Sequence, residues 1–221
     1  MQNINYQEKI AEILINISSV KFSFDNPFTL TSGNKSPVYV DCRKIISHVN
    51  ERNIILQTTA EYIKNNNLKF DIFAGGETAG IPYAAFLADR FQKKMIYVRK
   101  KTKGFGKNQQ IEGTFRENQK VILVEDLATD GGSKVIFVEA MRKAGLIVKD
   151  VFVIFFYDIF DNKQSILSKL DVKIHSLCTW KDIISVIKKR NLYDQNEIEN
   201  LQKFLSNPEE WRKLNAWYNI S

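Results

Sequence analysis

Two adjacent carboxylates stand where an apolar strand pattern gives way to a glycine-bearing turn. Glu125 and Asp126 directly follow the β-forming residues 121–124, and the turn at residues 129–133 precedes a helical pattern over residues 134–144. Ligands of open α/β sheets bind at the carboxyl ends of strands, and backbone N–H groups at a helix start hold phosphate. Because the two acids can also accept hydrogen bonds from a pair of hydroxyl groups, the segment fits a ribose 5-phosphate.

The spacing of this segment resembles the phosphoribosyl pyrophosphate (PRPP) signature of type I phosphoribosyltransferases. That signature is an apolar strand, two acids, two variable residues, Thr, a variable residue, Gly, a variable residue and then Ser or Thr. Glu125, Asp126, Thr129, Gly131 and Ser133 occupy those places. The resemblance implies that PRPP is bound by Glu125, Asp126, Leu127, Ala128, Thr129, Asp130, Gly131, Gly132 and Ser133.

Two other kinds of structure also place acids after an apolar strand. The metal-binding strand of a P-loop ATPase requires a Gly-x-x-x-x-Gly-Lys-Ser/Thr loop elsewhere, and the sequence contains none. A plain solvent-exposed turn after a buried strand is the second alternative. The agreement of residue type, order and spacing favours the PRPP interpretation.

A second segment, residues 99–107, combines five basic residues with two glycines. So few apolar residues after a strand pattern predict an exposed loop. An ordinary solvated basic loop has the same composition. Beside a PRPP site, however, such a loop could close over the pyrophosphate leaving group, stabilise its charge and exclude water.

A third segment, Gly75-Gly76-Glu77-Thr78, stands where a strand pattern turns into a helical one. Glycines there allow the backbone to approach a ligand closely, so Gly76 and Thr78 are candidates for a second anion site that binds the pyrophosphate of PRPP. A tight strand-to-helix turn without a ligand is the alternative.

Residues 28–43 extend the resemblance to one family, the orotate phosphoribosyltransferases, in which this segment forms part of a hood over the base. The resemblance covers roughly residues 20 to 160 in order. Arg99, Lys100 and Lys103 match the family's mobile catalytic loop and, with Asp126, are the implied catalytic residues. The implied orotate-binding residues are Ser32, Gly33, Tyr39, Arg43 and Thr129.

The chain also departs from the family pattern at positions that carry charge. Thr31 stands where the family commonly has Lys, and Ile159 stands where it often has Arg. The usual aromatic-Lys pair is replaced by Thr78-Ala79, and the loop His by Phe105. The contact to the orotate carboxylate is therefore unassigned, with Arg43 and Lys35 as candidate substitutes.

The resemblance implies conversion of orotate and PRPP to orotidine 5′-monophosphate and pyrophosphate in pyrimidine biosynthesis. It implies Mg²⁺ as cofactor, with Glu125 and Asp126 contacting the metal indirectly through ribose, pyrophosphate or water. It also implies a homodimer in which loop 99–107 reaches the neighbouring site. Two alternatives remain open: a purine-base phosphoribosyltransferase, and a non-catalytic PRPP-sensing regulator that binds nucleic acid.

Composition narrows these classes. The chain has 221 residues, 44% of them hydrophobic, and a net charge of +7, which suits a polyanionic ligand. The lysines form no aromatic-interleaved stripe, so we expect no nucleic-acid partner. Cys42 and Cys178 are far apart, which is typical of reduced thiols in a cytoplasmic protein. The apolar run 151–157 is far shorter than the roughly 20 residues of a membrane span, so we expect no membrane association.

These site residues need a scaffold, and the periodicity of the chain predicts one. Strand patterns alternate with helical patterns, which predicts an α/β fold of the type I phosphoribosyltransferase class, with a mostly parallel sheet flanked by helices. We expect a single domain over 1–221, comprising an N-terminal helix and hood (1–45), an α/β core (46–180) and a helical C-terminal extension (181–221) whose role is packing or subunit contact. The expected helices are 6–20, 54–65, 78–91, 134–144, 182–189 and 195–205. The expected strands are 28–43 as short strands or a hairpin, 70–74, 95–99, 121–124, 151–157 and 174–177.

Overall fold

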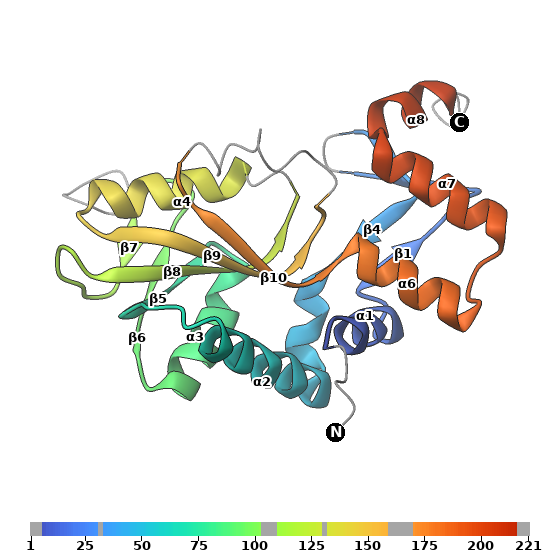
Figure 1. The fold of residues 1–221 in the computed structure, drawn as a ribbon. Helices are drawn as coiled ribbons and strands as arrows, with labels where there is room; N and C mark the ends of the chain where they lie inside the picture. Colours follow the sequence, from blue (N-terminus) through green and yellow to red (C-terminus); the bar gives the residue numbers. More distant parts are fainter. Residues whose placement is uncertain (1–5, 31–32, 103–109, 130–131, 159–169, 216–221) are drawn as a thin grey trace.

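The computed structural model describes the whole chain except residues 1–5, 31–32, 103–109, 130–131, 159–169 and 216–221. Its described part contains a six-stranded sheet in the order β10-β9-β8-β5-β6-β7 (Figure 1). All neighbouring strands are parallel except β6 and β7, which are antiparallel. The strands are β5 (Ile72–Gly76), β6 (Lys94–Val98), β7 (Ile111–Glu112), β8 (Lys120–Ala128), β9 (Ile147–Phe156) and β10 (Lys173–Thr179).

Helices cover both faces of the sheet (Figure 1). Helix α4 (Gly132–Lys143) lies on one face, and α2 (Val49–Asn65) and α3 (Gly80–Phe91) lie on the other. Because successive side chains of a strand point to opposite faces, Leu123 of β8 joins the cluster under α4, whereas Val124 joins the cluster under α3. The near-continuous apolar run of β8 is therefore explained by burial on both faces.

The N-terminal segment forms the hood. Helix α1 (Tyr6–Asn16) leads into β1 (Val20–Phe22), which pairs antiparallel with β4 (Val38–Val40). Between them β2 (Phe28–Thr29) and β3 (Lys35–Ser36) form the expected hairpin. A 3₁₀ helix, η1 (Cys42–Ser47), follows, and Tyr83 Oη of α3 donates to the Cys42 carbonyl at 2.6 Å, so the hood is tied to the body.

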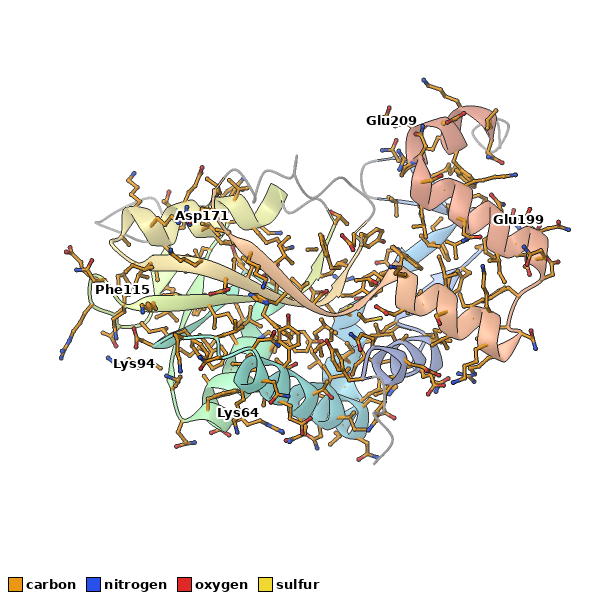
Figure 2. All side chains as sticks on the ribbon, viewed as in Figure 1. Lys64, Lys94, Phe115, Asp171, Glu199 and Glu209 are labelled. Carbon is orange, nitrogen blue, oxygen red and sulfur yellow. The ribbon has the colours of Figure 1, made fainter. Side chains whose placement is uncertain are left out.

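The C-terminal extension consists of α6 (Trp180–Arg190), α7 (Gln195–Ser206) and α8 (Pro208–Leu214), drawn in orange to red in Figure 1. Two capping residues define its later helices: Asp194 Oδ1 accepts from Glu197 N, and Asn207 Oδ1 accepts from Glu210 N. Figure 2 shows the side chains of this region, with Glu199 labelled on α7 and Glu209 on α8.

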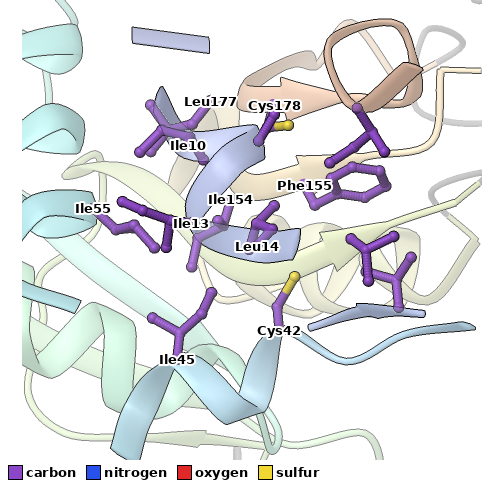
Figure 3. Close-up of a cluster of buried hydrophobic side chains, with 14 of the residues drawn as sticks. Ile10, Ile13, Leu14, Cys42, Ile45, Ile55, Ile154, Phe155, Leu177 and Cys178 are labelled. Carbon is purple, nitrogen blue, oxygen red and sulfur yellow. The ribbon is translucent and has the colours of Figure 1, made fainter. Parts of the chain in front are cut away.

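One apolar cluster joins the hood, the body and the extension. Figure 3 shows part of it, in which Leu14 of α1, Cys42 of η1 and Ile154 and Phe155 of β9 lie together with Cys178 of β10. The same cluster continues to Trp180, Leu201 and Trp211 in the extension. Helices α6–α8 thus share the core of the sheet. No helix in the described ranges is long and apolar enough to span a membrane.

Several element boundaries differ from those expected, among them the start of β9, at Ile147 instead of 151. Helix α1 ends at Asn16 instead of residue 20, because Ser18 takes a left-handed φ of 54° and Val20 enters β1. Helix α2 begins at Val49, five residues before the expected start at 54. Strand β8 runs through both acids to Ala128, since β9 continues to pair with it as far as Phe156.

Candidate active site

The turns after β5 and β8 lie side by side at the carboxyl edge of the sheet. The two strands are neighbours, although β6 follows β5 in the chain and pairs on its other side. This reversal of strand order is the topological switch point at which α/β proteins bind ligands. The glycines that end β5 and begin α3 allow the close approach: a Cβ on Gly76 would lie 2.1 Å from Glu125 Oε1, and one on Gly80 would lie 2.2 Å from the Val124 carbonyl.

Glu125 lies in the interior of this switch point. It is 6% exposed, and its Oε2 forms an ion pair with Lys134 Nζ of α4 at 3.2 Å. Within the described part of the chain its Oε1 has no hydrogen-bond partner. Burial raises the pKa of Glu125 to about 7, and the positive charge of Lys134 opposes that rise. No local pattern in the sequence indicated that Lys134 would pair with this acid.

Asp126 is adjacent in sequence but lies in a different environment. The alternation of β8 places its side chain on the opposite face of the strand from Glu125, on the side of η1. Its charged or ionisable neighbours include Lys134, Arg43, Cys42 and Tyr83. Burial raises the pKa of Asp126, while Lys134, backbone N–H groups and Arg43 favour the ionised form. The residue is only partly buried. Of the two acids, Asp126 is therefore the one placed to accept a hydrogen bond from a ligand hydroxyl.

The turn after β8 leads directly into a helix, as the signature predicts. Helix α4 begins at Gly132, so Gly132 and Ser133 contribute the first backbone N–H groups and the positive end of the helix dipole faces the turn. Thr129 is exposed beside the end of β8, whereas Ala128 is fully buried. Asp130 and Gly131 lie outside the described residues.

Hydrogen bonds connect the β5 turn to the stem of the basic loop. Glu77 N donates to the Val98 carbonyl at 2.9 Å, and Glu77 Oε2 accepts from Lys100 N at 2.8 Å. Thr78 is exposed next to it. The charge of exposed Lys100 also lowers the pKa of Glu125, which places Lys100 near the acidic pair.

Arg99 closes the stem of the same loop. Its Nη1 lies 3.2 Å from Glu112 Oε1, and its backbone N–H donates to the Gln110 carbonyl at 2.8 Å. These contacts hold Arg99 in the stem of the loop, where the chain leaves the sheet after β6 and returns to it at β7. Lys103 lies outside the described residues, so the loop tip is known only from the sequence.

The hood brings Tyr39 and Arg43 together. Arg43 Nη2 donates to Tyr39 Oη at 3.4 Å, and the Tyr39 ring packs against Phe28 with centroids 5.8 Å apart. Arg43 also pairs with Asp41 Oδ1 at 2.7 Å, and its side chain is 60% exposed. Gly33 forms the exposed turn of the hairpin with a φ of 82°, and Ser32 lies outside the described residues.

A cavity of about 430 Å³ lies between the hood, the end of the sheet and the C-terminal extension. Thr129 and Tyr157 line it from the positions just after β8 and β9, Leu30 from the hairpin, and Phe204 and Arg212 from the extension. Sequence reasoning did not find Tyr157 or the extension as parts of the site. No local pattern could have indicated them, because they reach the cavity only through tertiary packing.

The described residues contain no cluster of three or more His, Cys, Asp or Glu side chains that could hold a metal ion by themselves. A partly buried carboxylate, Asp126, stands next to basic residues instead. Such a site suits a ligand that brings its own oxygen donors, as a phosphorylated sugar does.

Comparison with known proteins identifies the family to which this arrangement belongs. Residues 45–190 match the family model described as the phosphoribosyl transferase domain. The chain is 45% identical over 207 residues to orotate phosphoribosyltransferase of Roseobacter denitrificans, covering 93% of this chain and 92% of that one. It is 42% identical over 211 residues to the enzyme of that name from Rhizobium rhizogenes, covering 95% and 91%. This chain belongs to the orotate phosphoribosyltransferase family.

Solved structures show the same fold. Orotate phosphoribosyltransferase from Aeropyrum pernix superposes with a TM-score of 0.70 at 28% identity, covering 84% of this chain and 99% of that chain. UMP synthase of Leishmania donovani gives a TM-score of 0.75 at 25% identity, covering 90% of this chain but 42% of that longer chain. The expected type I phosphoribosyltransferase fold, a mostly parallel sheet flanked by helices, is confirmed.

Proposed function

We propose that this protein transfers the phosphoribosyl group of PRPP to orotate, forming orotidine 5′-monophosphate and pyrophosphate in pyrimidine biosynthesis. One observation carries the proposal. Three features of this chain converge on one edge of its sheet, at the switch point: the partly buried carboxylate of Asp126, the start of α4 and the stem of the basic loop.

The PRPP half of the site is built from the turn after β8 and the turn after β5. Backbone N–H groups at Gly132 and Ser133, with the rest of turn 127–133, hold the 5-phosphate at the positive end of α4. Asp126 accepts hydrogen bonds from the ribose hydroxyls. Glu125 supports the site from within, because its carboxylate is already paired with Lys134. Gly76 and Thr78 bind the pyrophosphate.

The reaction is a displacement at the anomeric carbon of the ribose. Positive charge develops on the sugar ring as the bond to pyrophosphate breaks, and the carboxylate of Asp126 stabilises that charge. Lys100, Lys103 and Arg99 stabilise the negative charge on the leaving pyrophosphate when the loop closes. The protein needs no covalent nucleophile, since orotate itself attacks.

We infer that Mg²⁺ binds together with PRPP. The site supplies few carboxylates and several positions for phosphate oxygens, and this donor set fits Mg²⁺, which binds substrate phosphates and retains water. When bound, the ion neutralises charge on the pyrophosphate. With the ion bound, Asp126 and Glu125 would act on it indirectly, without being its direct ligands.

The base lies on the hood side. Thr129 links this side to the PRPP turn, the charge of Arg43 acts on Asp126, and Arg43 in turn donates to Tyr39. We propose that Ser32, Gly33, Tyr39, Thr129 and Arg43 contact orotate.

We further propose a homodimer in which loop 99–107 completes the neighbouring site. A location in the cytoplasm is proposed because both cysteines are buried free thiols.

Incubation of the purified protein with PRPP, Mg²⁺ and each of orotate, uracil, hypoxanthine, guanine and adenine tests the proposal through pyrophosphate release. We expect release with orotate. Release only with a purine would contradict the orotate assignment and identify a purine-base enzyme. Binding of PRPP without release for any base, together with salt-dependent binding to DNA, would instead indicate a regulator.

A further inference from the structure

We propose that Arg212, on the C-terminal helix α8, binds the carboxylate of orotate and so selects orotate over uncharged pyrimidines. This inference rests on the proposed function, because orotate is a planar pyrimidine that carries one carboxylate beside its ring. It gives the C-terminal extension a part in substrate recognition in addition to the packing expected from the sequence.

The position of Arg212 is the first support. Arg212 and Thr129 line the same cavity of about 430 Å³, a volume within the range of small-molecule sites. Thr129 belongs to the turn that the PRPP signature identifies. A ligand in contact with that turn can therefore reach α8 without leaving the cavity. Figure 2 labels Glu209 on the part of α8 nearer the carboxyl edge of the sheet, and Glu209 also lines the cavity.

The walls of the cavity suit a flat ring. Leu30, Tyr157, Phe204 and Pro208 give it apolar surfaces from the hairpin, the sheet and the extension. Tyr157 is held edge-on against Trp180, with centroids 5.5 Å apart, so its ring has a fixed orientation. A pyrimidine ring between such walls leaves its polar substituents to be matched by a small number of polar side chains.

Most polar side chains of the cavity already have other partners. Ser36 Oγ donates to a hood carbonyl at 2.7 Å, and Ser206 Oγ donates to a carbonyl of α7 at 2.9 Å. Asn207 caps α8, accepting at its Oδ1 from Glu210 N at 3.1 Å. Glu209 is negative and repels a carboxylate. These four side chains are therefore poor candidates for binding the orotate carboxylate.

Arg212 is the only positively charged residue among the described residues that line the cavity. Its Nε donates to the Lys35 carbonyl at 3.1 Å, and its guanidinium carbon lies 5.9 Å from the centroid of the Phe204 ring. In the described part of the chain its Nη1 and Nη2 have no hydrogen-bond partner. A guanidinium that is fixed at one nitrogen and open at the other two suits a carboxylate, which it binds through parallel N–H groups.

The two candidates suggested by the sequence are less suited to this role. Arg43 pairs with Asp41 at 2.7 Å, and its side chain is 60% exposed. Lys35 Nζ donates to Thr29 Oγ1 at 3.1 Å on the hairpin. Neither lines the cavity. Lys35 contributes through its backbone instead, as the acceptor that fixes Arg212.

The variants Arg212→Met and Arg212→Lys test the proposal in the full-length protein. The KM for orotate and the KM for PRPP are measured separately, and the ratio of kcat/KM for orotate to that for uracil is determined for each variant. Loss of a charge-assisted hydrogen bond raises the KM for orotate by roughly tenfold to a hundredfold in Arg212→Met. The KM for PRPP changes by less than about twofold, because the PRPP turn is untouched.

Arg212→Lys restores part of the orotate affinity, since it keeps the charge but loses the paired N–H groups. Lys213→Met is the matched control. It removes one positive charge from the next residue of α8, which is exposed and does not line the cavity. We expect it to leave both KM values unchanged. If Arg212→Met does not fold, the orotate-to-uracil ratio of Arg212→Lys decides, and we expect it to fall.

An unchanged KM for orotate in a folded Arg212→Met protein overturns the proposal. Equal increases in both KM values also overturn it, because they indicate that Arg212 only holds α8 in place. Failure of the wild-type protein to use orotate is a different result, which refutes the proposed function itself.

Discussion

The two halves of the proposed site are assembled in different ways. The PRPP half comes from short contiguous segments, in which a strand, a turn and the next helix follow one another. The base half is assembled from the hairpin, the end of β9 and helices α7 and α8, which are far apart in the sequence. The first half therefore carries a readable signature, whereas the composition of the second could be found only from the packed structure. We expect mutations to separate the halves in the same way. Mutations in the PRPP half should lower activity with every base, whereas mutations in the base half should lower activity with orotate alone.

The largest effect should come from removing Mg²⁺, which serves the PRPP half. In excess chelator we expect loss of turnover, because the charge of pyrophosphate is no longer neutralised. Pyrophosphate release measured before and after restoring Mg²⁺ checks this prediction. Full activity in the chelator would show that the basic loop suffices without a metal.

Asp126→Asn should have the next largest effect. Loss of a carboxylate that faces developing positive charge lowers kcat by about 10²- to 10³-fold. The decrease should be the same for orotate and for any slower base, because the ribose is common to both. Asp89→Asn, at an exposed position on α3, is the control for loss of one negative charge. A decrease confined to orotate would place Asp126 in the base half and break the comparison.

Lys100→Ala should have a smaller effect, a decrease in kcat of about tenfold to a hundredfold. The side chain is lost from the stem of the loop, but its backbone N–H bond to Glu77 Oε2 remains. Lys101→Ala, at the neighbouring exposed position, is the matched control. Equal rates for the two variants would show that Lys100 does not contact the leaving group.

The smallest effect concerns stability. Burial raises the pKa of Glu125 to about 7, so between its unfolded value and pH 7 the folded protein binds more protons than the unfolded protein. The contribution of Glu125 to stability is thus fully present below about pH 4.5 and is lost as the pH rises through 7. Glu125→Gln, which does not titrate, should become more stable relative to wild type between pH 5 and pH 8.

Urea unfolding of both proteins at the two pH values measures this difference. Glu139→Gln, on the exposed side of α4, controls for the loss of one carboxylate. A difference between Glu125→Gln and wild type that stays constant with pH would mean that Lys134 keeps Glu125 ionised throughout, and that the ion pair dominates over burial.

The separate roles of the two acids in the PRPP half could also be assigned only from the structure. The two acids are both carboxylates and are adjacent in sequence, so the sequence predicted PRPP binding for both and implied a catalytic role for Asp126 alone. In the sheet they point to opposite faces: Glu125 forms an ion pair with Lys134, whereas Asp126 lies on the side of η1 and feels the charge of Lys134 without pairing with it. The alternation of strand side chains could have predicted this separation, but only once both acids were known to lie inside β8. The strand pattern of residues 121–124 ended too early to reveal it.

The roles proposed for Ser32, Lys103, Asp130 and Gly131 still rest on the sequence, since these residues lie outside the described ranges. For Gly76, Thr78, Thr129, Tyr39 and Arg43, the described geometry brings each to the carboxyl edge of the sheet or to the hood beside it. Their contacts with PRPP and orotate remain predictions.

The sequence by itself determined the family, the sheet-and-helix scaffold and the place of the PRPP turn. These features depend on local rules of periodicity, spacing and turn chemistry, which act over a few consecutive residues. Only the tertiary structure decided that Lys134 pairs with Glu125 and that the Lys35 carbonyl accepts a hydrogen bond from Arg212. The same holds for the position of α8 beside the cavity at Thr129. Those contacts join residues distant in the chain. They exist because one apolar core, running from α1 through the sheet to Trp211, holds the C-terminal helices against the hood.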